Sequence, residues 1–234
     1  MDIKSQKARA RLQARQARRT AFHRSAGPEL LRYFPAERFK GAVIAGFWPL
    51  KGEIDVRPLL YALHDMGHQL ALPCTPRVGK PLVMRAWSPE DELKIGSFDT
   101  REPFSTRAEI RPDVVLMPLL AFTKTGERLG YGGGFYDRTL EGLRSSKSTS
   151  GDVFTCGVAF AGQEAAFLPT NEHDQRLDAI LTENYFKDFF QNLEQNLVSI
   201  DAFGLGFKVQ QNTVPHRWQV DSPHIFKADV VTSL

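Results

Sequence analysis

The chain has 234 residues, of which 42% are hydrophobic and 24% charged, a composition that suits one α/β domain with an appendage and argues against two large domains. No apolar run approaches the roughly 20 residues that span a bilayer, and the charged N-terminus lacks the apolar stretch of a secretory signal, so we expect a cytoplasmic protein. The net charge of +3 is concentrated in residues 1–24, which hold eight Lys and Arg and one acid; this favours one anionic ligand, or a basic arm, over a broad nucleic-acid-binding surface.

Residues 2–24 contain no Gly or Pro and are rich in Ala, Arg, Lys and Gln, a composition that predicts a long helix ending at Gly27 and Pro28. One narrow face of this helix carries small apolar side chains, and another carries a basic stripe at helical spacing. The small face consists of Ala10, Ala14, Ala17 and Ala21, and the basic stripe of Lys4, Lys7, Arg11, Arg15 and Arg18. We expect the small face to dock on a sheet and the basic stripe to face a cleft.

Apolar runs of strand length alternate with helical patterns through the rest of the domain. Strands are expected over 42–48, 69–73, 113–117, 154–160 and 177–182, helices over 28–34, 54–66 and 135–143, a strand or hairpin arm over 81–87, irregular chain over 88–111, and a long connection over 119–134. This alternation predicts a parallel or mixed sheet with ligands at the carboxyl ends of its strands. Beyond about Lys187 no α/β unit is recognisable, so we expect a domain over 1–187 and a C-terminal extension over 188–234 of low functional content.

A glycine-rich loop from Arg128 to Arg138 is the strongest functional signal. Its glycines, Gly130, Gly132, Gly133 and Gly134, allow backbone N–H groups to approach an anion without intervening side chains. The helix expected to begin near Phe135 adds its positive end. The loop is not a Walker A motif, because no Lys-Ser or Lys-Thr follows, and it fails the dinucleotide-binding pattern at Phe135. The alternative is a glycine-rich turn that feeds a helix.

Two aspartates are candidate Mg²⁺ ligands. Asp137 falls in the first turn of the expected helix, where it is either a helix-end acid or, beside a bound triphosphate, a metal ligand. Asp174 ends the segment 168–174, whose other interpretation is a polar turn.

Lys7 and Arg11, at i and i+4, are spaced to bind one polyanion from the same helix face, although a solvated basic face is the usual explanation of such a pair. Nucleic-acid binding is less favoured because Phe22 is the one aromatic residue of this segment.

A carboxylate and two aromatic residues follow the expected first strand. Phe47, Trp48 and Glu53 form a set that can bind a flat heterocycle with ring N–H donors. The alternative is a purely structural role, in which Glu53 is a helix-end acid and Trp48 a core residue.

The pair His64 and His68 has the spacing of a metal-binding pair on a helix, but Gly67 interrupts that helix and no third ligand is evident, so zinc is not expected. Cys74 and Cys156 are expected to be buried thiols without a disulfide.

The segment from Met117 to Arg138, MPLLAFTKTGERLGYGGGFYDR, resembles the signature of the 5-formyltetrahydrofolate cyclo-ligase family, also called the 5,10-methenyltetrahydrofolate synthetases. The basic N-terminal helix, the Gly-Glu-Ile-Asp segment at 52–55 and the Asn-Glu-His-Asp segment at 171–174 accompany it in the order typical of the family. The resemblance covers roughly residues 4–185. It implies an α/β, Rossmann-like three-layer fold with a mostly parallel sheet, of the sugar-phosphate isomerase and CoA-transferase type.

The resemblance also implies the reaction and the roles of individual residues. The activity is the ATP- and Mg²⁺-dependent cyclisation of 5-formyltetrahydrofolate, by a monomer that acts on small molecules and not on nucleic acid or membranes. The residues implied to bind ATP are Lys7, Arg11, Arg128, Leu129, Gly130, Tyr131, Gly132, Gly133, Gly134, Phe135 and Tyr136; those implied to bind Mg²⁺ are Asp137 and Asp174; and those implied to bind the folate are Trp48 and Glu53. Arg128 and Lys7 are implied to be catalytic. Members of the family often have Tyr where Phe135 stands, and the extension after Lys187 has no counterpart.

Two other classes of function use the same features. A nucleotide-sensing or RNA-binding module would use the glycine-rich loop and the basic helix without turnover. A relative of the sugar-phosphate isomerases or CoA-transferases, suggested by fold analogy alone, would not consume ATP. Appearance of methenyl absorbance from 5-formyltetrahydrofolate and Mg·ATP separates the three.

Overall fold

A seven-stranded sheet organises the computed structural model, which describes residues 2–145 and 152–190. The strand order is β11-β10-β9-β6-β1-β2-β3. The five inner strands are parallel: β1 (Val43–Ala45), β2 (Gln69–Cys74), β6 (Val114–Pro118), β9 (Phe154–Val158) and β10 (Ala179–Leu181). The edge strands β3 (Val83–Trp87) and β11 (Phe186–Asp188) are antiparallel to their neighbours. The expected mostly parallel α/β sheet is therefore confirmed.

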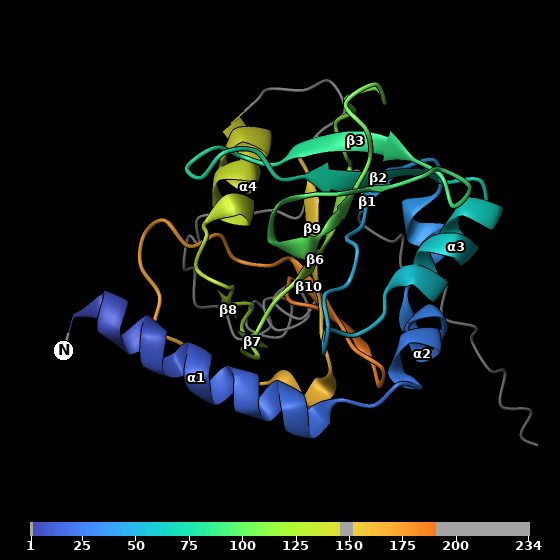
Figure 1. Cartoon of the computed structure of the whole chain (residues 1–234). Coiled ribbons are helices and arrows are strands. Elements are labelled where there is room, and N and C mark those ends of the chain that lie inside the picture. The colour runs from blue at the N-terminus through green and yellow to red at the C-terminus, as the bar shows by residue number, and fades with distance from the viewer. Residues whose placement is uncertain (1, 146–151, 191–234) are drawn as a thin grey trace, which may run out of the picture.

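Helices cover both faces of the sheet and one of its ends (Figure 1). On one face lie α2 (Ala26–Tyr33) and α3 (Arg57–Asp65), and on the other lies α4 (Phe135–Ser145). Because side chains alternate across a strand, β6 sends Val114 and Leu116 to the first core and Val115 and Met117 to the second. Short 3₁₀ turns, Ala36–Phe39, Ser97–Asp99 and Ala161–Gln163, join these elements.

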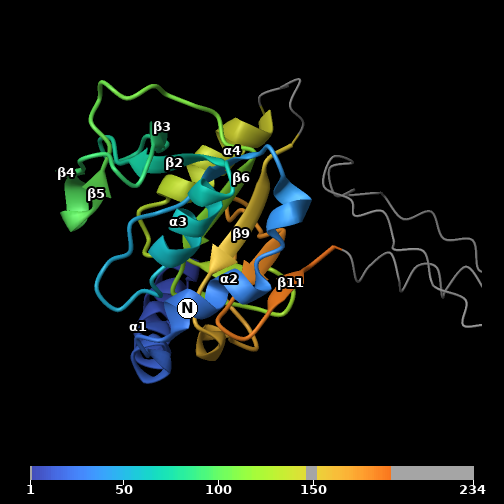
Figure 2. The ribbon, with the colours of Figure 1, turned by 90° about the vertical axis from the view of Figure 1, so that its right-hand side faces the viewer.

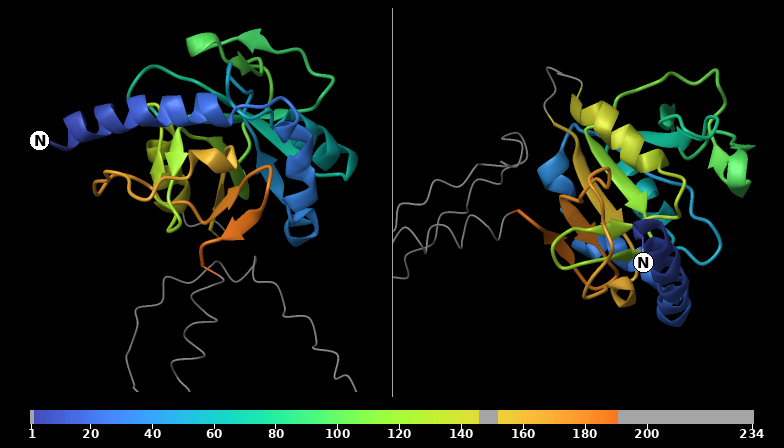
Figure 3. Two further views of the ribbon diagram at one scale, coloured as in Figure 1. Left: turned by 90° about the horizontal axis from the view of Figure 1, so that it is seen from below. Right: turned by 90° about the vertical axis from the view of Figure 1, so that its left-hand side faces the viewer.

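The basic N-terminal helix α1 (Ile3–Ala21) lies across the end of the sheet rather than on either face (Figure 3). Asp2 caps it by accepting a hydrogen bond from the Ser5 N–H at 2.9 Å. Ala14 is buried against the small hairpin of β7 (Ala121–Phe122) and β8 (Arg128–Leu129). Ala10 and Ala21 are partly buried, but Ala17 is exposed, so the small-residue face is narrower than the sequence predicted.

Several boundaries differ from the sequence predictions for identifiable reasons. The long helix ends at Ala21, and Gly27 and Pro28 lie in the first turn of α2, a position that proline tolerates well. A Cβ on Gly27 would lie 2.4 Å from the Asp55 carbonyl oxygen, so the glycine permits close packing there. Strand β1 stops at Ala45 instead of residue 48, because the chain turns out of the sheet over α3: a Cβ on Gly46 would lie 2.6 Å from the Leu60 side chain.

The region 88–111 is mostly irregular, as expected, but it contains the two-stranded hairpin β4 (Lys94–Ile95) and β5 (Arg101–Glu102). This hairpin projects from the body of the molecule beside β2 and β3 (Figure 2). The sequence also did not predict β11, which ends at Asp188, one residue past the expected boundary of the domain. Its Asp188 makes a buried ion pair with Arg38 at 2.7 Å.

Two sequence expectations concern cysteines and membranes. Cys74 is half-buried and Cys156 buried, and both are free thiols, as expected. Within 2–145 and 152–190, none of the helices combines the length and apolar character needed to cross a bilayer.

Candidate active site

One pocket of about 500 Å³ lies where α1, the glycine-rich loop and the ends of the inner strands meet. Phe47 and Trp48 follow β1, Pro73 belongs to the end of β2, and Pro118 ends β6. These strands are parallel, so their carboxyl ends share one edge of the sheet, which is where such folds bind ligands. Every residue that the resemblance assigns to ATP, folate or Mg²⁺ lines this pocket.

The glycine-rich loop forms one wall of the pocket and leads into α4. Gly132 has φ 103° and Gly134 has φ 65°, values that L side chains rarely adopt. A Cβ on Gly132 would lie 3.1 Å from the Arg11 guanidinium carbon, and Arg11 Nε donates to the Gly130 carbonyl at 3.0 Å. The loop therefore presents backbone, not side chains, beside a cation and the positive end of a helix, as an anion site requires.

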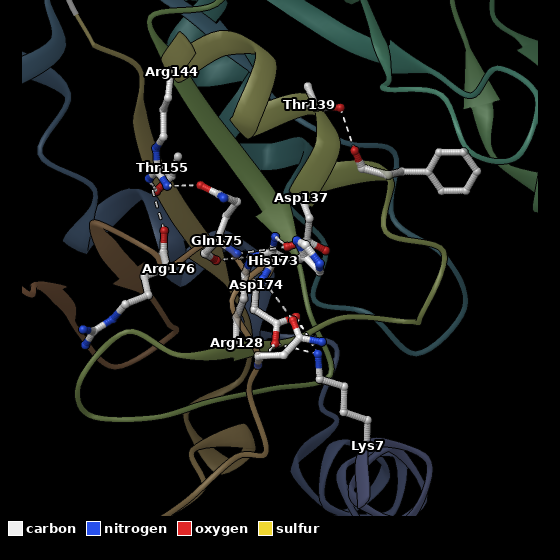
Figure 4. A network of polar contacts seen from close by, with 12 residues as sticks. Lys7, Arg128, Asp137, Thr139, Arg144, Thr155, His173, Asp174, Gln175 and Arg176 are labelled. Carbon is white, nitrogen blue, oxygen red and sulfur yellow. Dashed lines mark hydrogen bonds and ion pairs between the residues drawn. The ribbon is translucent and has the colours of Figure 1, made fainter. Parts of the chain in front are cut away.

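Two ion pairs lie where the N-terminal part of α1 meets the pocket. Lys7 Nζ donates to both carboxylate oxygens of Asp174, at 2.7 and 2.5 Å. Arg128 Nη2 donates to Asp137 Oδ1 at 2.5 Å, and its Nε donates to the Gln175 carbonyl at 3.1 Å. In Figure 4 the Lys7 side chain extends from α1 toward Asp174, with Arg128 and Asp137 next to it. The residues assigned to the phosphates are therefore paired with those assigned to the metal.

Burial strengthens this network of alternating charges. Only 8% of Arg128 is exposed, and burial lowers the pKa of its guanidinium while Asp137 and Asp174 raise it. The Gln175 N–H donates to Asp137 at 3.2 Å and the Asn171 N–H to Asp174 at 2.7 Å, so backbone groups fix both carboxylates. A ligand that brings both an anion and a divalent cation can exchange partners with these pairs without leaving a charge uncompensated.

The two carboxylates provide the oxygen donors that Mg²⁺ prefers. Mg²⁺ is commonly held by one or two protein carboxylates together with substrate phosphates and water. Asp137 and Asp174 line the same pocket as the glycines of the glycine-rich loop, so the residues present fit this mode of binding. His64 and His68 lie on and after α3, and the described residues contain no group of three or more His, Cys, Asp or Glu suited to a metal.

The other end of the pocket is aromatic and acidic. Glu53 is 8% exposed and accepts hydrogen bonds from the Leu50 N–H at 2.7 Å and from the Tyr131 hydroxyl. Burial raises the pKa of Glu53 above its ordinary value, and the hydrogen bonds from these two donors and the charge of Arg18 offset only part of that rise. Trp48 stacks edge-on against Trp87 with ring centroids 6.2 Å apart. The sequence thus correctly placed Glu53 and Trp48 beside one cavity.

The hairpin β4–β5 supplies pocket residues that sequence reasoning missed. Phe98, Thr100 and Arg101 line the cavity, and Phe98 contacts Phe135 edge-on with centroids 6.1 Å apart. No motif marked these residues, because they lie in a charged, turn-rich segment that was expected to be irregular. Their proximity arises only from the fold.

Only some residues of the basic stripe of α1 line the pocket. Lys7 and Arg11 line the pocket, whereas Lys4 and Arg15 do not. Arg18, to which no role was assigned, donates to the Tyr131 hydroxyl and lies 3.9 Å from Glu53 Oε1. Arg138 instead donates a hydrogen bond to the Gly133 carbonyl of the loop at 2.7 Å and does not line the pocket.

The fold and the pocket together define an α/β protein with an anion-binding loop and a separate acidic, aromatic subsite at the carboxyl edge of its sheet. The model of the 5-formyltetrahydrofolate cyclo-ligase family matches residues 3–183. The chain belongs to this family.

Relatives and solved structures agree with this assignment. The chain is 34% identical to an Escherichia coli K12 5-formyltetrahydrofolate cyclo-ligase over 144 residues, which cover 59% of this chain and 76% of the relative. It is 31% identical to the Mycolicibacterium smegmatis 5-formyltetrahydrofolate cyclo-ligase over 187 residues, 76% of this chain and 93% of the relative.

Two solved structures share the fold. An Aquifex aeolicus 5,10-methenyltetrahydrofolate synthetase superposes with a TM-score of 0.59 at 23% identity, covering 91% of this chain and 98% of the other. The corresponding values for a synthetase from Mycoplasma pneumoniae are 0.57 and 19%, with 78% and 99% covered.

Proposed function

We propose that this chain catalyses the ATP-dependent cyclisation of 5-formyltetrahydrofolate to 5,10-methenyltetrahydrofolate, with release of ADP and phosphate. Membership of the family supports the reaction. The observation that carries the proposal is the convergence of an anion-binding end and an acidic, aromatic end in one pocket. A phosphoryl donor and a flat heterocycle can thus be held side by side.

The nucleotide phosphates are proposed to lie on the glycine-rich loop. The N–H groups of residues 130–134 and the N-terminus of α4 would hold them, with Lys7, Arg11 and Arg128 as cations. Asp137 and Asp174 would hold Mg²⁺, which supplies further neutralisation of phosphate charge. Phosphoryl transfer depends mainly on such positioning and charge stabilisation and needs no protein nucleophile.

The folate is proposed to occupy the acidic, aromatic end. The Glu53 carboxylate suits the ring N–H donors of a pterin, and Trp48 offers an apolar wall. Leu129, Tyr131, Phe135 and Tyr136 would contact ligand where the two ends meet.

The chemistry then follows from the weakness of a formamide as an electrophile. The formyl oxygen attacks the γ-phosphorus and ADP leaves, which turns that oxygen into part of a phosphate leaving group. The N10 lone pair adds to the activated carbon and N10 loses its proton. Phosphate departs with the former formyl oxygen, leaving a cationic methenyl bridge between N5 and N10. Lys7 and Arg128 are the proposed catalytic cations, since both line the pocket beside the loop that would hold the phosphates.

The proposal includes action as a monomer on small molecules. It also includes a cytoplasmic location, a cyclo-ligase domain over residues 1–187 that holds the active site, and an extension over 188–234 of low functional content.

The proposal is tested by mixing purified protein with 5-formyltetrahydrofolate and Mg·ATP and following methenyl absorbance and ADP together. Equal amounts of both products are expected. ADP-free binding would indicate a nucleotide-sensing or RNA-binding module, and turnover of another substrate without ATP would indicate an isomerase or transferase.

A further inference from the structure

Arg18 lies behind the acidic end of the pocket and is connected to Glu53 through Tyr131. Its Nη1 donates to the Tyr131 hydroxyl, and that hydroxyl donates to Glu53 Oε1. The Arg18 guanidinium also lies 5.6 Å from the centre of the Tyr131 ring and 3.9 Å from Glu53 Oε1. The three groups therefore form a directed chain from a cation, through a neutral hydroxyl, to a carboxylate.

The two charged ends of this chain are largely shielded from water, whereas Tyr131 as a whole residue is 38% exposed. The Arg18 side chain is 15% exposed and the Glu53 side chain 4%. In such surroundings a hydrogen bond accepted from a cation strengthens the hydroxyl as a donor. Tyr131 therefore fixes one oxygen of Glu53, while the Leu50 N–H fixes the other.

The position of Arg18 on α1 separates it from the cations at the nucleotide end. Arg11 and Arg18 are seven residues apart, so they lie on nearly the same helix face with a rise of about 10 Å between them. Arg11 bonds the Gly130 carbonyl and lines the pocket, whereas Arg18 reaches the next residue of the loop and is not a lining residue. The helix thus serves both ends of the pocket with different arginines.

We propose that Arg18 is a positioning residue for the folate end of the site, holding Glu53 ionised and correctly oriented through the Tyr131 hydroxyl. This inference rests on the proposed function, because it assumes that Glu53 binds the ring N–H groups of the folate. A carboxylate can accept two parallel N–H donors only when it is ionised and held in one orientation. Arg18 acts on the ligand indirectly and is therefore distinct from Lys7 and Arg128.

The charges around Glu53 determine the expected effect of pH. Arg18 on α1 and Tyr131 on the loop face it directly, and the Leu50 N–H faces it from its own loop. Tyr136 on α4 is also near, since its hydroxyl has a pKa raised first by burial and then by the charge of Glu53. Burial also raises the pKa of Tyr131, so this hydroxyl stays protonated. Arg18 is consequently the one cation among these neighbours, and its removal should raise the pKa of Glu53.

The test compares Arg18→Met with Arg19→Met, a control that removes the same charge from the next, exposed residue of α1. In Arg18→Met the KM for 5-formyltetrahydrofolate should rise about tenfold or more, the range expected for loss of a charge-assisted hydrogen bond. The KM for ATP should stay within twofold, and the acidic limb of kcat/KM for the folate should move to higher pH. Arg18→Lys should recover part of the loss.

Tyr131→Phe separates the indirect contact from a direct one. If Arg18 acts through the hydroxyl, adding Arg18→Met to Tyr131→Phe should weaken folate binding no further than Tyr131→Phe alone. Thermal unfolding of each variant checks that the fold is retained.

Three results would overturn the inference or its basis. Equal folate KM values in Arg18→Met and Arg19→Met would overturn the role of Arg18 while leaving the proposed function intact. A parallel rise in the KM values for ATP and folate would show displacement of α1 and would also overturn it. A wild-type chain that neither binds nor converts 5-formyltetrahydrofolate would overturn the proposed function itself.

Discussion

Replacing Arg128 with Ala tests the nucleotide end of the site most directly. The Arg128 side chain is 5% exposed and is paired with Asp137, whose side chain is 27% exposed. Breaking a fully buried pair costs about 3–5 kcal/mol. Because water reaches Asp137, we expect a smaller loss in the free energy of unfolding, about 2 kcal/mol, which lowers Tm by roughly 4–8 °C in a chain of this size.

The functional loss should exceed what this destabilisation explains. Arg128 supplies a preorganised cation at the proposed phosphoryl group, and removal of one such donor typically reduces kcat by about 10²–10³. We expect kcat/KM for ATP to fall at least about 100-fold in Arg128→Ala, measured from initial rates of methenyl formation well below Tm. Mg·ATP should also fail to raise Tm in this variant, although it stabilises the wild type by mass action.

Arg144 provides the matched control. It belongs to the same polar network, donating to the Gln175 side-chain oxygen at 2.8 Å, but it is not a lining residue of the pocket (Figure 4). Arg144→Ala removes the same charge and should leave kcat/KM for ATP within about threefold, as expected for a substitution outside the pocket. If Arg128→Ala and Arg144→Ala retained similar activity, Arg128 would have no special role in phosphoryl transfer.

Three further predictions follow from the geometry. Gly132→Ala should raise the KM for ATP about tenfold, since its φ of 103° strains an L side chain and a Cβ would push against the adjacent Arg11 guanidinium, whereas Gly142→Ala in α4 should stabilise the fold by about 0.5–1 kcal/mol; similar ATP kinetics in the two variants would contradict the loop assignment. Asp174→Ala should raise the Mg²⁺ concentration for half-maximal ADP release about tenfold, by loss of one ligand, and an unchanged Mg²⁺ titration would remove it from the metal site. Truncation after Phe190 should leave kcat and both KM values within about twofold, because the sheet through β11 is preserved; a large loss of activity would show that the extension contributes to the site.

Local patterns were sufficient to identify most of the chain's helices and inner strands. The Ala-rich, Gly-free N-terminal segment forms α1, and the apolar run before Pro118 forms β6, because helix propensity and strand alternation depend on neighbours close in sequence. The errors fall where packing overrides propensity. Gly27 lies inside α2 because of its contact with Asp55, and β1 is shortened because the chain must pass over Leu60.

Many of the pocket residues, although not those of the β4–β5 hairpin, could also be identified from the sequence. The glycine-rich loop, Trp48 and Glu53 each follow a strand or precede a helix, and parallel strands bring such positions to one edge. The residues of the 117–138 segment and their spacing indicated the family, which composition and periodicity alone did not identify.

Only the tertiary structure decided how these residues are paired. Lys7 and Asp174 are 167 residues apart, and Tyr131 and Glu53 are 78 apart, so no local rule links them. Their contacts depend on where α1 crosses the end of the sheet. The same placement brought in Arg18 from a basic stripe whose members look alike in sequence, and folding back of the β4–β5 hairpin brought in Phe98. Backbone freedom and periodicity are encoded locally, whereas the partner of a buried charge depends on which distant segments meet.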